Sequence, residues 1–561
     1  MKSKTWSGIF TLLLAGSLLL SACQPAPSAI SSATEPAANA RTANANTTIT
    51  IGTTEKPTSF DPASVIAARD LENIMNIGEG LLRYKPGSIE LEPGLATGMP
   101  VVSSDGLTYT FTLRDGIKFG DGGVLTAGTY AKQLTRLFHG GTGCLDNAAN
   151  FVMNFLVLPY IKTITAPDDR TLVFNLKNPK AYFPHILTHP AFVPTNPAVF
   201  PLYGCAPLPP APIYGVGPWY ISQYSVDAQV VFETNPYYTG ELKPQVGKVI
   251  VKYFADAQSL SQAIQGGTVD IAWNTVDNVL QAGFLDPLKK VTGVHTGTVN
   301  GGFLYSLVIN HVIAPMDDPN LVKAIASAID RSALINTVWG AWAVPAYSMI
   351  PPEFLGVENT FDKVYGAPNL DKAKQYLTAS GYTESHPLQL KLPYPVSYPI
   401  AGKVIPLIKK QIEASGLIQV ELNGEDEKTY QSEFGSGTPA AWVEEWYPDF
   451  GDPAEILDAY IYQLGSGTNI SRIQSGPLAE KVSQLLALAH QADIETDQTK
   501  RIGLYHQVQE LYADLVVTLP LVLDTPHIVY RDGIRGSAQY ASPEALNIGP
   551  MLELSYSMLE K

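Results

Sequence analysis

The chain has 561 residues, of which 45% are hydrophobic and 16% charged. This length and composition predict two or more domains with sizeable cores and exclude a disordered chain, a coiled coil and a collagen. Lys and Arg total 37 against 52 Asp and Glu, for a net charge of −15, and this acidic balance argues against a nucleic-acid-binding protein, which needs a basic surface for phosphates.

The N-terminus predicts export rather than a folded element. Lys2 and Lys4 precede an apolar run over 9–20, which is shorter than the ~20 residues that a membrane-spanning helix needs. The run ends in Leu20-Ser21-Ala22-Cys23, which resembles a bacterial lipobox, where the Cys receives a lipid and becomes the mature N-terminus. We therefore expect 1–22 to be a lipoprotein signal peptide and Cys23 to be lipidated. An ordinary secretory signal that happens to contain a Cys is the alternative.

Residues 23–47 are expected to carry the lipid and form a flexible tether, because they hold almost no large apolar side chain. Lipid chains hold a protein on a membrane surface without making it span. Besides Cys23, the chain has two cysteines, Cys144 and Cys205. In an oxidising compartment these two most simply form a disulfide, and two unpaired buried thiols are the alternative. No Cys or His spacing indicates a metal site or a cofactor.

Beyond the tether, strands and helices alternate along the chain. Strict alternation of apolar residues predicts strands, and helical spacing predicts helices. A Pro-rich stretch over 190–213 predicts a long irregular connection. Strands are expected at 48–51, 107–113, 171–176, 228–233, 249–254, 388–392 and 418–422, and helices at 67–82, 126–138, 257–265, 321–334, 370–380, 400–415 and, as a pair, 479–515. The helix over 400–415 lies between two strands as a β-α-β unit, so the expected fold class is α/β.

A series of short motifs follows a fixed order between residues 59 and 331. They are Ser59-Phe60-Asp61-Pro62 with Gly78-Glu79-Gly80-Leu81-Leu82, Asp105-Gly106-Leu107-Thr108-Tyr109, Leu113-Arg114-Asp115-Gly116, Asp121-Gly122 with Leu125-Thr126-Ala127, Gly215-Val216-Gly217-Pro218, Asn235-Pro236-Tyr237, Gly267-Thr268-Val269-Asp270 and Ala328-Ile329-Asp330-Arg331. Together they resemble family 5 of the extracytoplasmic solute-binding proteins, which are the peptide, nickel and oligosaccharide receptors of ABC importers.

The resemblance implies a two-lobed fold of the periplasmic-binding-protein type II kind, with an extra subdomain on the first lobe. Lobe I is expected at 48–82, 215–300 and 524–561, the subdomain at 83–214, and lobe II at 301–523. Gly301-Gly302 and Asp524-Thr525-Pro526 lie at the expected crossovers between the lobes, where a few residues can absorb a hinge rotation. Both Cys144 and Cys205 fall inside the subdomain.

The segment Ala441 to Pro453 is the expected ligand site. Its end, from Trp446 onward, resembles a family motif in which an Asp holds the α-ammonium group of a peptide, and Asp449 matches that position. By the same resemblance, Glu445 and Tyr447 pair through their main chain with the ligand, and Glu445 favours a cationic ligand. On lobe I, Ala68 matches the opposite ligand-facing edge. Asp452, by contrast, is predicted to cap a helix that starts at Pro453, with Glu455 in its first turn.

Three further patterns bear on function. Dipeptide-binding members carry an Arg where this chain has Ser397, so longer peptides or an uncharged terminus are favoured over strict dipeptides. His185 and His189 have helical spacing but lack the Glu of a zinc protease motif and are expected to be structural. Glu444, Glu445 and Asp449 would suit a hydrolase acid pair, but neighbouring Glu residues on a strand point to opposite faces.

The sequence therefore predicts a lipid-anchored, non-enzymatic receptor on the extracytoplasmic face of the cell membrane. It binds a solute between two lobes, most simply a peptide, and delivers it to an ABC permease. The same kind of receptor for an oligosaccharide or a metal chelate is one alternative, and a surface hydrolase is the alternative from another class. No cofactor, metal or nucleic acid is expected, and the chain is expected to be a monomer.

Overall fold

A computed structural model describes residues 44–65, 67–85, 88–138, 152–200, 206–274, 282–298, 302–396, 400–462, 468–536 and 554–561. Cys23, Cys144, Cys205, Gly301 and Ser397, together with the predicted signal peptide and most of the tether, lie outside these residues. No helix among the described residues is long and apolar enough to cross a membrane.

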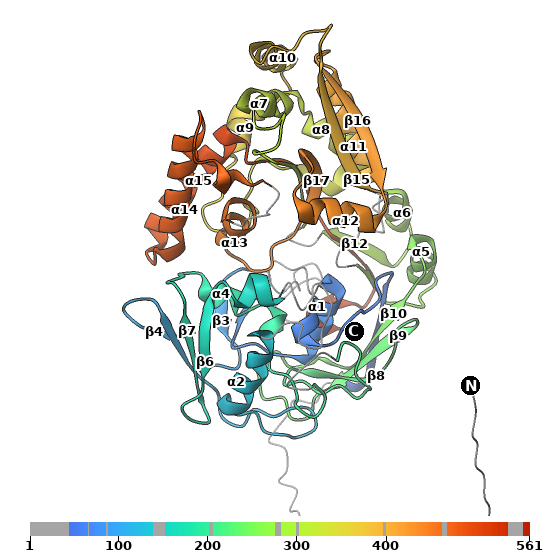
Figure 1. Ribbon diagram of the computed structural model, residues 1–561. Helices are drawn as coiled ribbons and strands as arrows, with labels where there is room; N and C mark the ends of the chain where they lie inside the picture. Colours follow the sequence, from blue (N-terminus) through green and yellow to red (C-terminus); the bar gives the residue numbers. More distant parts are fainter. Residues whose placement is uncertain are drawn as a thin grey trace, which may run out of the picture. The chain divides into compact units, whose positions relative to one another are not determined.

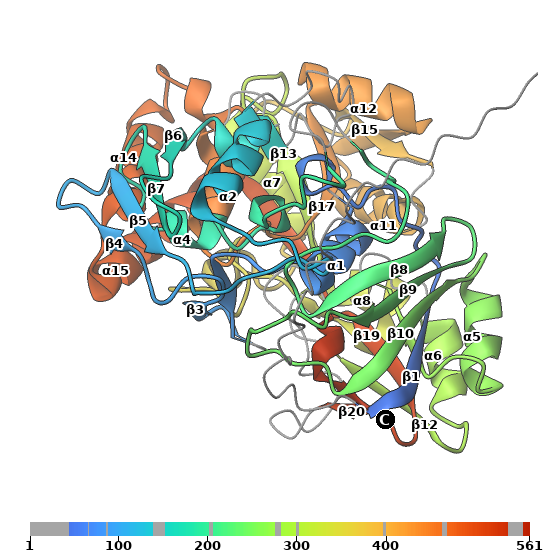
Figure 2. The same cartoon turned by 90° about the horizontal axis from the view of Figure 1, so that it is seen from below.

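The largest sheet has seven strands, and it combines the first part of the described chain with its last part (Figures 1 and 2). β1 pairs in parallel with β10 and β11, and the other pairs are antiparallel. The strand order is β12 (Val294–Thr298), β19 (His527–Arg531), β11 (Ile271–Trp273), β1 (Asn44–Thr53), β10 (Val246–Tyr253), β9 (Gln229–Thr234) and β8 (Trp219–Ser225).

Helices lie on both faces of this sheet. α5 (Ala257–Gln265) and α6 (Ala282–Leu288) share one apolar cluster with β11, β12 and β19, and Gly52 of β1 faces Leu260 of α5. The next residue, Thr53, points to the opposite face, because successive side chains of a strand alternate. There it meets Arg69 of α1 (Ala68–Ile77).

Helix α1 is shorter than predicted, because Gly78, which follows it, does not continue the helix. The amide of Gly78 closes the last turn on Ile74 and its own φ is extended, and Leu82–Tyr84 forms strand β2, paired with β3 (Leu91–Pro93). The predicted helix end at residue 82 is therefore wrong.

A second sheet has four strands, in the order β14 (Ala343–Pro345), β18 (Thr518–Asp524), β13 (Leu304–Ile309) and β17 (Ala441–Trp446). The predicted β-α-β unit lies beside it as parallel strands β15 (Leu388–Pro395) and β16 (Ile418–Glu425) with α11 (Ala401–Glu413). The other helices of this part are α7 (Pro319–Ala328), α8 (Arg331–Val338), α9 (Thr360–Tyr365), α10 (Leu370–Ala379), α12 (Glu427–Ser436), α13 (Ala454–Leu457), α14 (Ala479–Ile494) and α15 (Gln498–Leu515).

A third sheet, also of four strands, has a separate apolar core. Its order is β4 (Val101–Val102), β5 (Thr108–Thr112), β7 (Thr171–Leu176) and β6 (Ile161–Thr165), and α2 (Ala127–Thr135), α4 (Phe183–Ile186) and the single turn η4 (Pro190–Phe192) accompany it. Phe450 and Ala454, which come from the region after β17, complete this core. A two-stranded antiparallel sheet is formed by β20 (Arg535–Gly536) and β21 (Leu559–Glu560).

The chain passes from the seven-stranded sheet to the β13 sheet before Leu304 and returns after Asp524. The two connections touch each other: Asp524 donates its amide to the carbonyl of Phe303 at 2.9 Å, and a Cβ on Gly302 would lie 1.7 Å from the Asp524 carbonyl oxygen. Only glycine fits at position 302, because any side chain would force these two connections apart.

Candidate functional site

Strand β17 lies at the end of its sheet, with β13 on one side only. The main-chain carbonyl of Ala440 accepts from Asn310, at the end of β13. The carbonyl of Val443 accepts from the hydroxyl of Tyr430, on α12, at 3.4 Å. Since main-chain groups alternate in direction along a strand, the main-chain groups of Glu445 and Tyr447 point away from β13, as Val443 does. This is the outer edge on which the sequence places main-chain pairing with a ligand.

The side chains around this edge are partly aromatic. Trp446 packs edge-on against Tyr460, with ring centroids 6.2 Å apart, and Tyr447 packs edge-on against Phe303 at 5.0 Å. The hydroxyl of Tyr460 donates to Glu444 at 2.9 Å. Glu444 thus has a structural partner, and burial raises its pKa to about 7.

Asp449 lies in the loop between β17 and α13, and its side chain is 15% exposed. Burial raises the pKa of Asp449 to about 7. A second carboxylate, Glu455 of α13, is 4% exposed and accepts hydrogen bonds from the Trp446 indole at 3.0 and 3.2 Å. Burial, and after it the charge of Asp449, raise the pKa of Glu455 well above its ordinary value. Two carboxyl groups of like charge therefore interact in a largely buried site.

The residue that faces Asp449 from the third sheet is His189, which precedes η4. Its Nε2 lies 4.0 Å from Asp449 Oδ1, and its side chain is 1% exposed. Its Nδ1 accepts from the amide of Ala191 at 3.0 Å, so the proton of the neutral ring is on Nε2. Burial lowers the pKa of His189 to about 3, and the ring brings no positive charge to Asp449.

His189 was predicted to be structural, and nothing in the sequence signals that it faces Asp449. Its predicted companion, His185, lies instead against Tyr84, whose hydroxyl is 3.2 Å from Nδ1. Among the described residues, no group of three His, Cys, Asp or Glu side chains is arranged to hold a metal ion.

Asp452 differs from Asp449 in having a full set of partners. Arg501 binds its two carboxylate oxygens at 2.7 and 2.8 Å, and the hydroxyl of Tyr505 donates to it at 3.0 Å. The predicted capping bond is present, since Asp452 accepts from the amide of Ala454 at 3.0 Å. The helix α13 is assigned from Ala454, but Pro453 already has helical φ and ψ, so the prediction that Asp452 caps a helix starting at Pro453 is confirmed. The prediction that Glu455 serves the helix start is incomplete, since its carboxylate bonds the Trp446 indole.

Several side chains near the third sheet hold the segment that follows Asp449. Tyr182 stacks on Phe450, with ring centroids 5.7 Å apart and planes at 7°, and its hydroxyl donates to Asp458 at 2.8 Å. Lys180 donates to Asp493 at 2.6 Å. The amide of Gly451 donates to the hydroxyl of Tyr84, also at 2.6 Å. Asp449 is thus enclosed between two parts of the chain that lie on different sheets.

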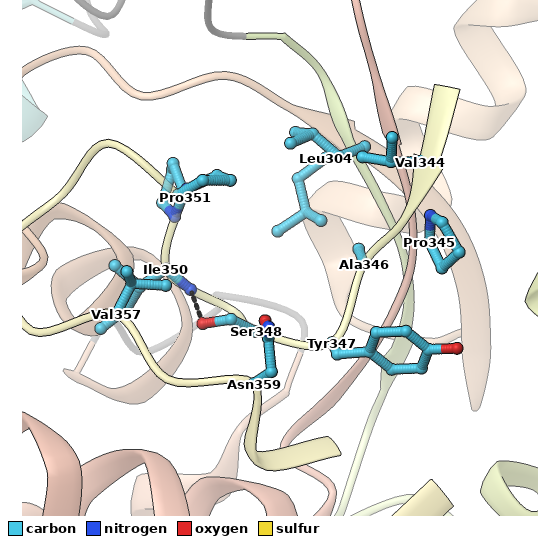
Figure 3. A pocket seen from close by; sticks show the side chains of 12 residues that line it. Leu304, Val344, Pro345, Ala346, Tyr347, Ser348, Ile350, Pro351, Val357 and Asn359 are labelled. Carbon is cyan, nitrogen blue, oxygen red and sulfur yellow. Dashed lines mark hydrogen bonds between the residues drawn. The ribbon is translucent and has the colours of Figure 1, made fainter. Parts of the chain in front are cut away.

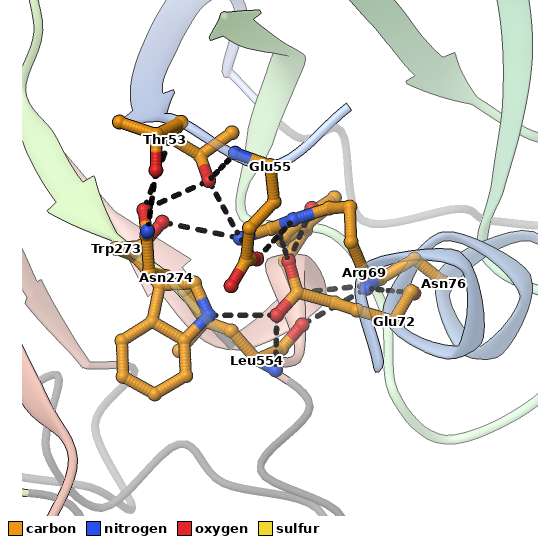
Figure 4. A network of polar contacts seen from close by, with 10 residues as sticks. Thr53, Glu55, Arg69, Glu72, Asn76, Trp273, Asn274 and Leu554 are labelled. Atoms are coloured by element: carbon orange, nitrogen blue, oxygen red, sulfur yellow. Dashed lines mark hydrogen bonds and ion pairs between the residues drawn. The ribbon is translucent and has the colours of Figure 1, made fainter. Parts of the chain in front are cut away.

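Ala68, the predicted residue on the opposite edge, is the first residue of α1 and is 1% exposed. Helix α1 contacts η4, the turn that follows His189. A buried network fixes this end of α1 (Figure 4): Arg69 donates to Glu72, Glu55 and the carbonyl of Trp273, and Glu72 in turn accepts from the Trp273 indole at 2.8 Å. The network holds the start of α1 against the seven-stranded sheet.

A separate cavity of about 280 Å³ lies beside β13, β14 and β18 (Figure 3). Leu304 and Leu523 are paired across the sheet, as are Leu523 and Val344, so all three side chains share one face. Trp446 also pairs with Leu304 and belongs to the same row. The Ser348 hydroxyl in this cavity accepts from the amide of Ile350 and bonds Gln509. Its walls carry no charged side chain, so it suits an apolar group and not an ammonium.

Comparison with known proteins gives consistent results. The model of bacterial extracellular solute-binding proteins, family 5 (middle), matches residues 90–468. The chain is 24% identical over 560 residues to the oligopeptide-binding protein OppA of Bacillus subtilis, covering 95% of this chain and 96% of that one. It is 25% identical over 512 residues to the dipeptide-binding protein DppE of the same organism, covering 86% and 88%.

Solved structures agree with these sequence matches. NikA from Brucella suis, solved in complex with Fe(III)-EDTA, is 20% identical and superposes with a TM-score of 0.76, covering 91% of this chain and 100% of that one. The structural neighbours are two-lobed binding proteins, which confirms the predicted α/β, two-lobed fold. The relatives are binding proteins and not enzymes, as predicted for this chain.

Proposed function

Because the chain belongs to family 5 of the bacterial extracellular solute-binding proteins, we propose that it is the receptor of an ABC importer, that it binds peptides and that it delivers them to a membrane permease. The resemblance found in the sequence is thereby confirmed at the level of the family. Peptides are favoured because the two relatives described above are named for oligopeptide and dipeptide binding.

The observation that carries the peptide proposal is the largely buried carboxylate of Asp449, which has no Lys or Arg within ion-pair distance among the described residues. Among the described residues, its ion-pair partner within 4.0 Å is His189 alone, which is neutral. An ionised carboxylate in a dry site is costly unless a positive group neutralises it. The α-ammonium group of a peptide supplies that charge and forms a strong charge-assisted hydrogen bond.

The rest of a peptide ligand would lie along the outer edge of β17. Glu445 and Tyr447 point their main-chain groups that way, and a peptide added as a further strand is held by its backbone, whatever its side chains are. Trp446 would line the site from the same strand, and Ala68 would face the ligand from α1. Entry requires the two lobes to separate at the connections through Gly302 and Asp524. A ligand that binds the closed form more tightly shifts the receptor toward closure.

The division into lobes remains part of this proposal: lobe I at 48–82, 215–300 and 524–561, the subdomain at 83–214 and lobe II at 301–523. The three sheets and the separate core of the third sheet support it.

We also propose that Cys144 pairs with Cys205, that the chain acts as a monomer, and that Ser397, in place of an Arg, leaves the receptor open to peptides longer than two residues.

The direct test of the proposed function is to identify what the protein carries. The full chain, purified in detergent from cells grown on a peptide-rich medium, is denatured, and the released small molecules are analysed by mass spectrometry. Peptides with free amino termini are expected. Recovery of oligosaccharides or metal chelates alone would replace the peptide proposal with one of its alternatives.

Ionisation of Asp449 predicts how peptide affinity depends on pH. With a pKa of about 7, Asp449 is largely protonated at pH 5.5 and cannot pair with an ammonium, so affinity should rise by up to about tenfold per pH unit below 7. Above about pH 8 the peptide's own α-amino group loses its proton, and affinity should fall again. Calorimetric titrations between pH 5.5 and 9 measure this; a flat profile would contradict the role of Asp449.

Cys23 is proposed to carry the lipid that holds the receptor at the extracytoplasmic face of the membrane, where members of the family act. In cells fed an alkyne-labelled fatty acid, the full chain should acquire the label and Cys23→Ser should not. Cys144→Ser is the matched control and should be labelled like the unmodified chain. A label that persists in Cys23→Ser would show that the segment is not a lipobox.

A further inference from the structure

The carboxylate pair formed by Asp449 and Glu455 has more negative charge than its surroundings neutralise. The two cations nearby are already engaged: Arg501 with Asp452 at 2.7 Å and Lys180 with Asp493 at 2.6 Å. In the part of the chain that the structure describes, no Lys or Arg lies within ion-pair distance of Asp449 or Glu455, and the ion-pair contact of Asp449 is with His189. Among the other ionisable groups nearby, His189 faces Asp449, Asp458 and Tyr460 interact electrostatically with Glu455, and His185 lies against Tyr84.

None of these groups brings a positive charge at neutral pH. Burial lowers the pKa of both histidines, so they are neutral. Asp458 is a further acid, and it accepts hydrogen bonds from the hydroxyls of Tyr160 and Tyr182. Among these groups none supplies a positive charge to Asp449 or Glu455, and the charge of Asp458 adds to that of Asp449 at Glu455.

A second observation, independent of the acids, indicates that the site is incomplete without a ligand. The Nε2–H of His189 has no hydrogen-bond acceptor among the described residues, its side chain is 1% exposed, and the nitrogen is directed at Asp449 from 4.0 Å. A buried donor left without an acceptor is costly. A peptide that places its α-ammonium on Asp449 brings its first carbonyl oxygen next to that ammonium, within reach of this donor.

One ammonium neutralises only one of the two carboxylates. With such a ligand Glu455 must stay protonated, because a second unpaired charge in a dry site is unfavourable. A ligand with a second positive charge close to its α-ammonium allows both groups to ionise and adds a charge-assisted hydrogen bond. Glu455 is well placed for this, since the Trp446 indole donates to both of its oxygens and fixes the carboxylate.

This inference rests on the proposed function. We propose that Glu455 is a specificity-determining residue, and that the receptor prefers peptides whose first residue carries a second positive charge, such as lysine. Asp449 holds the α-ammonium of such a peptide and Glu455 its side-chain ammonium.

The test compares two tripeptides that differ only in that charge: lysyl-alanyl-alanine and norleucyl-alanyl-alanine. They are titrated by calorimetry at pH 7 into the full chain in detergent. The lysyl peptide should bind about 10- to 100-fold more tightly. In Glu455→Gln the preference should shrink to less than about threefold, because the lysyl peptide weakens while the norleucyl peptide does not. Gln keeps an acceptor for the Trp446 indole, and the melting temperature verifies that the variant is folded.

Glu444→Gln is the matched control, since Glu444 is a half-buried carboxylate on β17 that already accepts from the Tyr460 hydroxyl, and its variant should keep the full preference. The inference is overturned if both peptides bind equally to the unmodified chain, or if Glu455→Gln retains the preference. Failure of the proposed function has a different signature: neither peptide binds the unmodified chain, or both bind Asp449→Asn as tightly as they bind the unmodified chain.

Discussion

Replacing Asp449 by Asn should weaken peptide binding by about a hundredfold or more and leave the fold intact. Removing one partner of a buried charged hydrogen bond costs about 2–5 kcal/mol, and about 3 kcal/mol corresponds to that factor. The variant also removes a carboxylate whose charged form is disfavoured by burial, so the melting temperature should stay the same or rise. Titration calorimetry and thermal unfolding of the same preparations measure the two effects.

Two controls locate the effect of this substitution. Asp371→Asn removes one negative charge from an exposed position on α10 and should leave affinity unchanged, which excludes a general electrostatic cause. Val344→Trp places a large side chain at the mouth of the apolar cavity beside β13, where Val344 is 47% exposed, and should also leave affinity unchanged. If Val344→Trp abolishes binding while Asp449→Asn does not, the ligand occupies that cavity.

The largest effect on stability is expected from Asp452. Replacing it by Ala leaves Arg501 charged, buried and without its bidentate partner, and breaking a buried ion pair in this way costs about 3–5 kcal/mol. The double variant with Arg501→Met should recover much of the loss, because it removes the stranded charge as well. Urea denaturation of the full chain in detergent measures the change.

The contrast with an exposed ion pair sharpens this expectation. Lys56 and Asp227 lie 2.8 Å apart with side chains 51% and 84% exposed, so Asp227→Ala should cost less than about 1 kcal/mol. Equal costs for Asp452→Ala and Asp227→Ala would mean that the Asp452–Arg501 pair does not hold α13 to α15.

Local sequence patterns predicted the parts of the fold that depend on neighbouring residues. The strand Thr108–Thr112 and the β-α-β unit from Leu388 to Glu425 were predicted correctly. In these segments buried residues recur at the spacing of a strand or of a helix. The end of α1 was misjudged, since apolar spacing continues through Leu81 although Gly78 already ends the helix. The spacing of apolar residues does not show that the backbone has left the helix at Gly78.

The site was predicted only in part, for a similar reason. Motif position singled out Asp449 and separated it from Asp452, whose neighbours Pro453 and Glu455 signal a helix start. The residue that faces each carboxylate lies far away in sequence: His189 faces Asp449, and Arg501 binds Asp452. Glu455 was predicted only to serve the first turn of the helix, and its bond to the Trp446 indole was missed because that bond depends on how the loop folds back. Contacts between residues so distant in sequence produce no periodic pattern of apolar residues from which they could be predicted.

The position of β19 within the seven-stranded sheet has a consequence for how the protein is made. β19 lies between β11 and β12, and Leu554 and Tyr556 bond Glu72 and Asn76 of α1. The earliest strands and helix therefore cannot complete their packing until the last residues of the chain have been synthesised. Pairing over such sequence separations is slow to form. A chain whose packing is completed only by its last residues suits the export that we propose for it, because a chain must be unfolded to pass through a secretion channel.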